Sequence, residues 1–235
     1  MLDIYQGVLF EDFNSINMKS NSKQRKLKYD SDKKRILNLQ WHNGYPVEGK
    51  EDMPLLQSYN GPLPEHLVSF SERSKGQYSC GLHCYEYDYK IDPAWNNPSK
   101  VVPCLQNYHT VIGPDYSIFV DQPRAINVWN IFRNRWVSSY WQANHIKVIP
   151  SASWGNVNSF EYCFDGLPED SVIAIGHIVK GSDRNYKRLY RLGVEALVDK
   201  KSPNTILVYG SPLDFDPGVN VVTYEGSLHK IRKTR

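Results

Sequence analysis

Short apolar runs alternate with longer segments of helical period over most of this chain. The short runs are rich in β-branched and aromatic residues, and runs of this length and composition are typical of strands. They predict strands at residues 66–70, 83–89, 110–119, 146–153, 172–176, 205–210 and 219–224. Most of these runs are apolar throughout, which is typical of strands that are buried on both faces.

Two longer segments carry large side chains at every third or fourth position, which places those side chains on one side of a helix. The first segment follows Pro123, a residue that suits the first turn of a helix, and its apolar and aromatic positions extend to Trp141. This spacing predicts a helix of about five turns. The second segment covers residues 183–201 and stops before Pro203, so we expect a second helix there.

Strands that alternate with helices predict an α/β fold with mostly parallel strands. Two arrangements fit the pattern: a TIM-barrel-like or partly closed barrel, and an open doubly wound sheet as the alternative. In both arrangements the functional groups lie at the carboxyl ends of the strands. The polar residues that follow the predicted strands are therefore the first candidates for a site.

The first 35 residues differ from the rest of the chain. Lys19 to Arg35 contains eight Lys or Arg residues and few large apolar side chains. A segment of this composition buries too little apolar surface to offset the entropy of ordering the chain. We expect residues 1–35 to be a basic, mobile amino-terminal arm and residues 36–235 to form a single α/β domain.

Charge and cysteine usage set limits on the partners and the compartment. Lys and Arg total 28 and Asp and Glu total 25, so the net charge points to no particular partner. The longest apolar run, residues 172–179, is interrupted by Gly176 and His177 and falls far short of the ~20 residues that span a bilayer. The four cysteines are few and irregularly spaced. We expect a cytoplasmic protein that does not contact a membrane.

Two acids and several possible ligand contacts follow the predicted strands. Asp115 and Asp121 are the candidate catalytic acids, because a carboxylate at a strand end can act as a general base. Arg133 and Arg135 could hold an anionic group such as a phosphate. Trp154 could stack on a flat ring, and we expect further ligand contacts from Ser117 and Tyr209.

Structural roles remain open for these residues. Asp115 follows Gly113 and Pro114, so it could cap a turn or a helix. Arg133 and Arg135 could form structural ion pairs with Asp115 or Asp121.

No motif in the chain demands one chemistry. Cys80, His83 and Cys84, with Cys104 and His109 further along, are too irregularly spaced for a zinc site, and we predict no metal. The chain has no G-x-x-x-x-G-K, G-x-G-x-x-G, G-x-S-x-G or H-E-x-x-H motif. These absences disfavour nucleoside triphosphate hydrolysis and zinc proteolysis. The sequence identifies no cofactor and leaves open whether the protein is an enzyme.

Several short motifs between residues 65 and 225 resemble one family of unknown function, found in bacteria, phages and mobile elements. They are PDYS at 114–117, WNIFRNRW at 129–136, YWQ at 140–142, IKVIP at 146–150, SW at 153–154, FDGLP at 164–168 and ILVYG at 206–210. The resemblance implies a shared fold and a protein of phage or mobile-element origin. It implies no activity, because the family has none that can be carried over.

Two hypotheses for function follow. The first is a strand-end pocket for an anionic, nucleotide-like ligand. The alternative is a non-catalytic protein that binds nucleic acid or a host protein, for example to interfere with host defence. That alternative depends on the basic arm and on the aromatic residues of the surface, because positive charge attracts phosphates and aromatic rings stack on unpaired bases.

Overall fold

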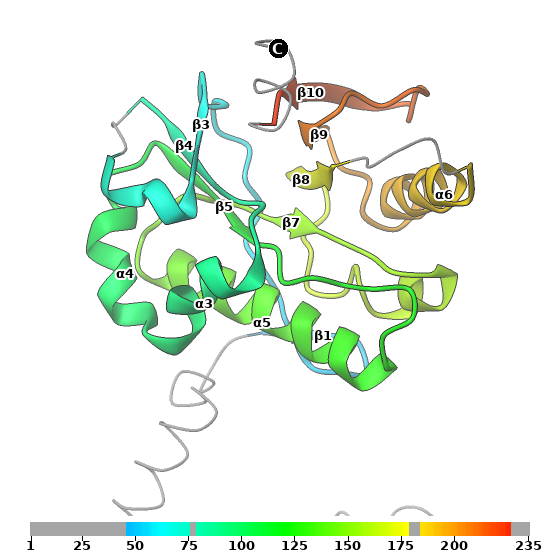
Figure 1. Ribbon diagram of the computed structural model, residues 1–235, viewed down its shortest axis with the longest axis horizontal. Helices are drawn as coiled ribbons and strands as arrows, with labels where there is room; N and C mark the ends of the chain where they lie inside the picture. The colour runs from blue at the N-terminus through cyan, green and yellow to red at the C-terminus, as the bar shows by residue number, and fades with distance from the viewer. Residues whose placement is uncertain (1–45, 76–78, 179–183, 227–235) are drawn as a thin grey trace, which may run out of the picture. The chain divides into compact units, whose positions relative to one another are not determined.

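In a computed structural model the protein has two four-stranded parallel sheets (Figure 1). The structure describes residues 46–75, 79–178 and 184–226. One sheet contains β3 (Leu67–Ser69), β4 (Gly81–Cys84), β5 (Thr110–Pro114) and β6 (Val148–Ile149). The other contains β7 (Ser151–Ala152), β8 (Val172–His177), β9 (Thr205–Gly210) and β10 (Asn220–Tyr224). A short antiparallel hairpin, β1 (Val47–Glu48) and β2 (Met53–Pro54), precedes them. The predicted amino-terminal arm, residues 1–35, and the basic carboxyl end lie outside the described residues.

Pro150 separates β6 from β7 within one extended stretch of chain. The residues before it pair with β5, and the residues after it pair with β8. Pro150 has no backbone N–H to donate, but its carbonyl accepts a hydrogen bond from the Ala174 N–H at 2.8 Å. The two sheets therefore meet at this stretch, which was predicted as a single strand.

The strands follow one another in chain order within each sheet. Sequential parallel order is the order found in singly wound folds, whereas a doubly wound sheet reverses its strand order at one point. Among the described residues no backbone ladder joins the outer strands β3 and β10, and closure of a barrel is not confirmed. The expected α/β fold, in which mostly parallel strands alternate with helices, is confirmed.

Four α-helices connect the strands: α3 (Asp88–Asn96), α4 (Pro98–Leu105), α5 (Arg124–Ala143) and α6 (Arg184–Lys201). Two short 3-10 helices, η2 (Phe70–Lys75) and η3 (Val157–Glu161), complete the connections. Helices α5 and α6 lie where the periodic pattern predicted them. None of the helices within the described ranges is long and apolar enough to cross a membrane.

The strand predicted at residues 83–89 is wrong beyond Cys84. The chain leaves the sheet there and enters α3, which buries Ile91, Ala94 and Trp95 on one face. Their spacing of three and four positions is helical. Tyr87 and Tyr89, which lie within the predicted strand, are each 68% exposed.

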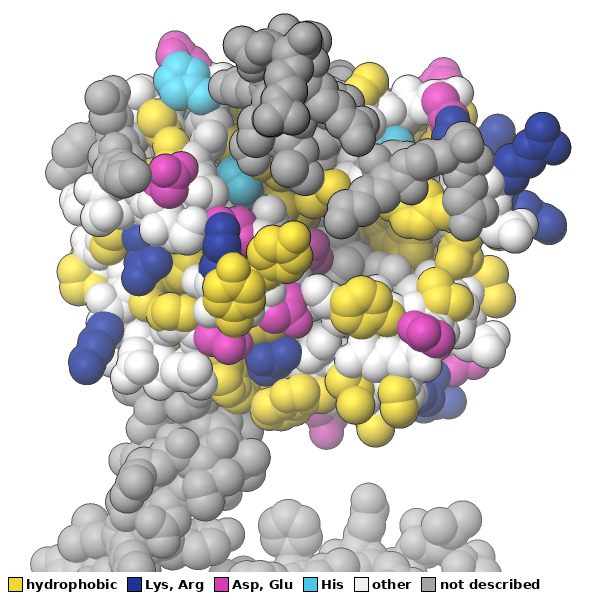
Figure 2. All heavy atoms as spheres, in the orientation of Figure 1, with side chains coloured by type: hydrophobic (Ala, Val, Ile, Leu, Met, Phe, Trp, Pro, Cys, Tyr) yellow, Lys and Arg dark blue, Asp and Glu magenta, His cyan; other side chains and the backbone are white. Residues whose placement is uncertain are grey.

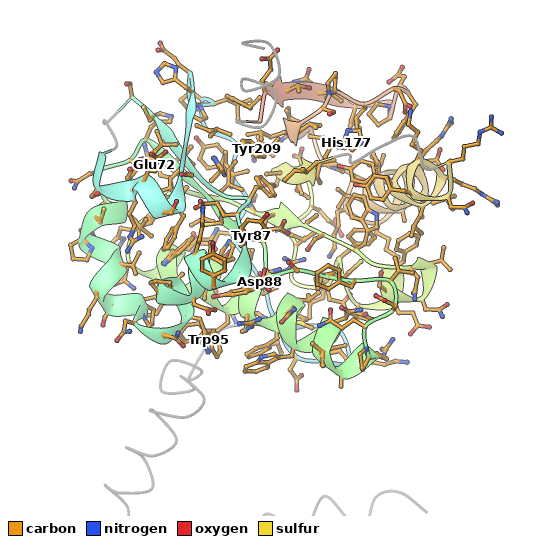
Figure 3. All side chains as sticks on the ribbon, in the orientation of Figure 1. Glu72, Tyr87, Asp88, Trp95, His177 and Tyr209 are labelled. Atoms are coloured by element: carbon orange, nitrogen blue, oxygen red, sulfur yellow. The ribbon has the colours of Figure 1, made fainter. Side chains whose placement is uncertain are left out.

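Strands β8 and β9 contribute side chains to two apolar cores, one on each face. On β8, Ile173 and Ile175 point to the core beneath α6, where they meet Val194 and Leu197. The alternate residues of β8 and β9 point to the opposite core, which also holds three tyrosines, Tyr59, Tyr85 and Tyr209. Figure 3 labels Tyr209, on β9, and His177, the last residue of β8, and Figure 2 shows Lys and Arg side chains gathered at the right of the molecule, where α6 lies.

Candidate functional site at the strand ends

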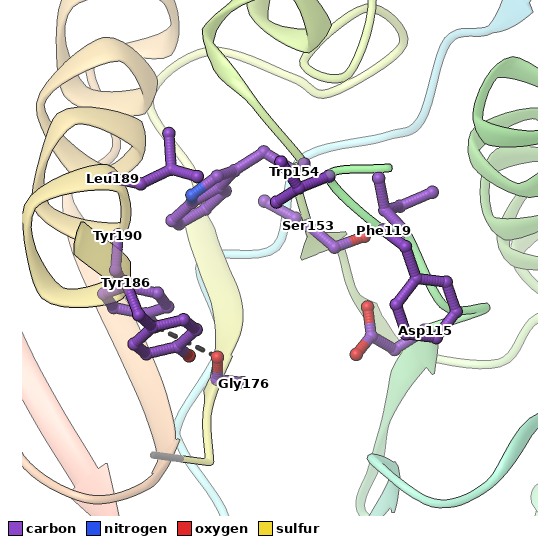
Figure 4. Close-up of a pocket in the computed structure, with 12 residues that line it drawn as sticks. Asp115, Phe119, Ser153, Trp154, Gly176, Tyr186, Leu189 and Tyr190 are labelled. Carbon is purple, nitrogen blue, oxygen red and sulfur yellow. Dashed lines mark hydrogen bonds between the residues drawn. The ribbon is translucent and has the colours of Figure 1, made fainter. Parts of the chain in front are cut away.

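A cavity of about 380 Å³ opens where β5, β7 and β8 end (Figure 4). Helix α6 forms one wall, and the segment that follows β5 forms the other. The lining residues are Asp115, Ile118, Phe119, Val120, Ala152, Ser153, Trp154, Gly155, Gly176, Tyr186, Leu189 and Tyr190. The site therefore lies at the carboxyl ends of parallel strands, where α/β folds carry their ligands.

Aromatic rings form much of the wall. Tyr186, Leu189 and Tyr190 are three and four positions apart on α6, so the helix presents them on one side. The Trp154 ring lies 5.2 Å from the Tyr190 ring, centroid to centroid. The Tyr190 hydroxyl donates to the carbonyl of Gly176 at 3.0 Å, which ties α6 to the end of β8 (Figure 4).

Gly193 is the residue of α6 that makes room for Trp154. A Cβ atom at this position would lie 2.0 Å from Trp154 Nε1 and 2.1 Å from its Cε2. We expect Gly193→Ala to displace the indole ring and to destabilise the protein by about 1–3 kcal/mol, as overpacking does. Urea denaturation followed by circular dichroism measures this loss.

The double variant Gly193→Ala/Trp154→Ala separates this clash from helix propensity. Without the indole, alanine at position 193 favours the helix by up to about 1 kcal/mol over glycine. The sign of the Gly193→Ala effect therefore reverses in the Trp154→Ala background. A destabilisation of equal size in both backgrounds contradicts the contact.

Asp115 is the acidic group of the cavity. It follows β5 directly, and its Oδ1 atom is buried and has no hydrogen-bond partner among the described residues. Burial, with a smaller contribution from the charge of Asp88, raises the pKa of Asp115 to about 7. Ser153 and Arg135 act in the opposite direction. The carboxyl group can therefore give or accept a proton near neutral pH.

Ser117 supports the site from outside the cavity. Its backbone N–H and its hydroxyl both donate to Asp88 Oδ1, at 3.1 and 2.7 Å. These bonds join the start of α3 to the segment that follows β5. Ser117 does not line the cavity, so the structure gives it a positioning role in place of the predicted ligand contact.

Neither predicted arginine lines the cavity. Arg135 is 1% exposed, and its three guanidinium nitrogens donate to the carbonyls of Ser151, Cys163 and Asp165 at 2.7–2.9 Å. These contacts hold β7 to a distant loop, and burial lowers the pKa of Arg135 to about 10. The guanidinium group of Arg135 is thus charged at neutral pH, and all three of its nitrogens donate to backbone carbonyls of the fold.

Arg133 lies on another side of α5. Its guanidinium carbon is 3.6 Å from the centre of the Tyr116 ring, and Nη2 donates to Asn130 Oδ1 at 2.6 Å. Its nearest acid is Asp92, at 3.9 Å, rather than the predicted Asp115 or Asp121. Within the described ranges no arginine lines the cavity, whereas the sequence predicted that Arg133 or Arg135 holds an anionic group there.

Asp121 and Tyr209 also lie away from the cavity lining. Asp121 is exposed. Tyr209 is buried, and its ring stacks on the Tyr85 ring at 5.1 Å. Of the predicted site residues, the structure therefore brings together only Asp115 and Trp154.

The sequence analysis missed Ser153, Tyr186 and Tyr190, which line the cavity. Ser153 directly precedes Trp154, and a strand-end position was a usable signal for it. The two tyrosines gave no separate signal, because a helical stripe of aromatic residues also predicts core packing.

His83, one residue of the cysteine and histidine group, is buried. The His83 imidazole Nδ1 accepts a hydrogen bond from the backbone N–H of Tyr85 at 3.2 Å, and burial lowers the pKa of His83 to about 4. In the part of the chain that the structure describes, no group of three or more His, Cys, Asp or Glu side chains could hold a metal ion.

Fold and site together define an α/β protein of parallel strands with an aromatic, acid-bearing cavity at the strand ends. A family model matches residues 45–224, and the chain belongs to that family, the domain of unknown function DUF4417. This match confirms the resemblance that the motifs indicated.

The chain is similar to two phage proteins, both called Gene 1 protein. That of Mycobacterium phage D29 is 34% identical over 179 residues, 74% of this chain and 65% of the relative. That of Mycobacterium phage L5 is 32% identical over 152 residues, 63% of this chain and 66% of the relative. The match thus covers just under two thirds of each relative's length. No solved structure matches the chain.

Proposed function

We propose that the strand-end cavity binds a flat heterocyclic ring, such as a nucleobase, and that Asp115 contacts the polar edge of this ring. The observation that carries the proposal is a buried carboxyl oxygen without a partner inside a cavity walled by aromatic side chains. A buried polar atom without a partner costs free energy, and a ligand that supplies the missing hydrogen bond recovers it.

The volume of the cavity and the side chains of its wall fit a flat ring as the ligand. A cavity of about 380 Å³ lies within the range that small ligands occupy, about 300–1,000 Å³. Trp154, Tyr186 and Tyr190 offer flat apolar surfaces, on which a base can stack.

Among the described residues no Lys or Arg lines the cavity. A phosphate beside Asp115 would meet a like charge and none of the described cations. In this proposal the ring enters the cavity and any phosphate attached to it stays outside. The proposal thus keeps the nucleotide-like ligand predicted from the sequence and moves its anionic part out of the pocket.

The test is calorimetric titration of the full chain with the four common nucleosides at pH 6 and pH 8. Because Asp115 loses its proton near pH 7, the affinity for at least one nucleoside changes about ten-fold between these two values. Asp115→Asn removes this pH dependence. Trp154→Ala lowers the affinity about ten-fold, because it removes a stacking surface.

Asp121→Asn is the matched control, since Asp121 is an exposed acid six positions further along that does not line the cavity. This variant keeps the affinity and the pH dependence of the unmodified protein. If no nucleoside binds, or if the two Asn variants behave alike, the proposal is wrong.

A further inference from the structure

We infer that the ring in the cavity belongs to a single-stranded nucleic acid rather than to a free nucleotide. The inference rests on the proposed function and adds two surfaces outside the cavity. One surface is the basic side of α6, and the other is a pair of exposed tyrosines at the start of α3. Bases and phosphates are common to DNA and RNA, so both kinds of strand fit.

The basic side of α6 faces away from the aromatic wall and lies on the outer surface of the same helix. Arg184, Lys187, Arg188 and Arg191 are exposed on the first two turns of the helix, the same turns that present Tyr186 and Tyr190 to the cavity. Figure 2 shows these turns as a concentration of Lys and Arg side chains at the right of the molecule.

Two of these cations remain available for phosphates. Lys187 pairs with Asp214 at 3.2 Å and Arg191 with Glu195 at 2.8 Å, whereas Arg184 and Arg188 form no ion pair within the described ranges. Arg184 and Arg188 lie on the outer side of α6, so they can meet the phosphates of neighbouring nucleotides of a strand, where charge attraction does not depend on the base.

Tyr87 and Tyr89 form the second surface. Each side chain is 68% exposed, and the two rings stack with their centres 5.9 Å apart and their planes 11° from parallel. Single-strand binding proteins use exposed aromatic rings in this way, because every base has a face that can stack. In Figure 3 Tyr87 lies near the centre of the view, with α6 to its right.

A hydrogen-bonded link fixes this pair relative to the cavity. Asp88, which lies between the two tyrosines in the chain, accepts from Ser117 at 2.7 Å. Two residues further on, Phe119 lines the cavity and is 55% exposed. Exposed aromatic side chains therefore lie on both of the segments that this hydrogen bond joins.

The acids around the tyrosines are already engaged. Glu86 accepts hydrogen bonds from Ser71 and pairs with Lys90 at 3.2 Å, and Asp88 is held by Ser117. In this arrangement bases stack over α3, one base enters the cavity, and phosphates further along the strand lie against the outer side of α6.

The test uses fluorescence anisotropy of the full chain with labelled six-nucleotide strands of random sequence, one of DNA and one of RNA. We expect at least one strand to bind about ten-fold or more tightly than any nucleoside. Arg184→Glu/Arg188→Glu lowers strand affinity about ten-fold and reduces the slope of log affinity against log salt by about 1.4, the value for two phosphates. Tyr87→Ala/Tyr89→Ala lowers strand affinity about ten-fold.

Both double variants keep the nucleoside affinity of the unmodified protein. Lys100→Glu/Lys147→Glu is the charge-matched control, because both lysines are exposed and neither lines the cavity. It leaves the salt slope unchanged. Equal losses in this control and in the α6 variant overturn the inference.

The two proposals fail in different ways. If nucleosides bind through Asp115 but strands bind no more tightly, the proposed function stands and this inference is wrong. If strands bind with an affinity that Asp115→Asn and Trp154→Ala leave unchanged, the cavity does not hold the base and both are wrong.

Discussion

Arg135→Met unfolds at a much lower urea concentration than the unmodified protein, with an expected loss of about 3–6 kcal/mol in the free energy of unfolding. The substitution leaves the carbonyls of Ser151, Cys163 and Asp165 without the donors that they have in the folded protein. Each buried carbonyl without a partner costs about 1–3 kcal/mol. Urea denaturation followed by circular dichroism measures the loss.

Arg133→Met is the matched control. It lies on the same helix, its side chain is 15% exposed, and its one short hydrogen bond is to Asn130. We expect it to cost about 1 kcal/mol. Equal losses in the two variants would show that Arg135 does not hold β7 to the loop that carries Cys163 and Asp165.

The contrast between these two arginines shows where sequence reasoning ends. They are two positions apart, and the motif around them offers no sign of their different roles. The role of Arg135 depends on three carbonyls that lie 16 to 30 positions away in the chain. Contacts between residues so far apart in the chain form only when the protein folds, and they leave no periodic pattern in the sequence around Arg135.

Local patterns predicted the parts of the fold that depend on neighbouring residues. Local patterns predicted two helices, α5 and α6, in which large side chains recur at every third or fourth position. They also predicted two buried strands, β8 and β9, which are continuous apolar runs. The same rule failed after Cys84, because alternating polar and apolar residues can also occur where a chain leaves a sheet and begins a helix. Tyr87 and Tyr89 alternate there without facing a core.

The candidate site was predictable where it depends on strand ends. Asp115 and Trp154 each follow a strand closely, and the carboxyl ends of parallel strands meet at one edge. Tyr186 and Tyr190 were not predictable as cavity residues, because a helix face that lines a cavity has the same spacing as one that packs a core. The cavity itself depends on Gly193, which leaves the space that the Trp154 ring fills.

Asp115→Asn is more stable than the unmodified protein at pH 8, by about 2–4 kcal/mol. The pKa of Asp115 is raised from 3.8 to about 7 in the folded protein. Between these two values the folded chain holds a proton that the unfolded chain has lost. The stability of the unmodified protein therefore falls as the pH rises from about 4 to about 7, and above pH 7 the whole penalty of the buried charge is present.

Asparagine has nearly the shape of the acid and never carries the charge, so the two proteins have similar stability at pH 4 and diverge as the pH rises. Urea denaturation at pH 4, 6 and 8 gives the difference in the free energy of unfolding between the two proteins at each pH. Asp121→Asn, at an exposed acid, changes stability by less than about 0.5 kcal/mol throughout. A constant difference between Asp115→Asn and the unmodified protein at all three values would mean that the carboxyl group is ionised throughout.

Because the charged carboxyl group of Asp115 destabilises the fold, we expect it to have a role in binding. Removal of its charge is expected to stabilise the protein and to abolish the pH dependence of nucleoside binding in the same variant. That trade between stability and binding is typical of functional groups held in apolar surroundings. A buried acid that only caps a turn would lose stability on substitution, so the sign of the change at pH 8 separates a binding role for Asp115 from a capping role.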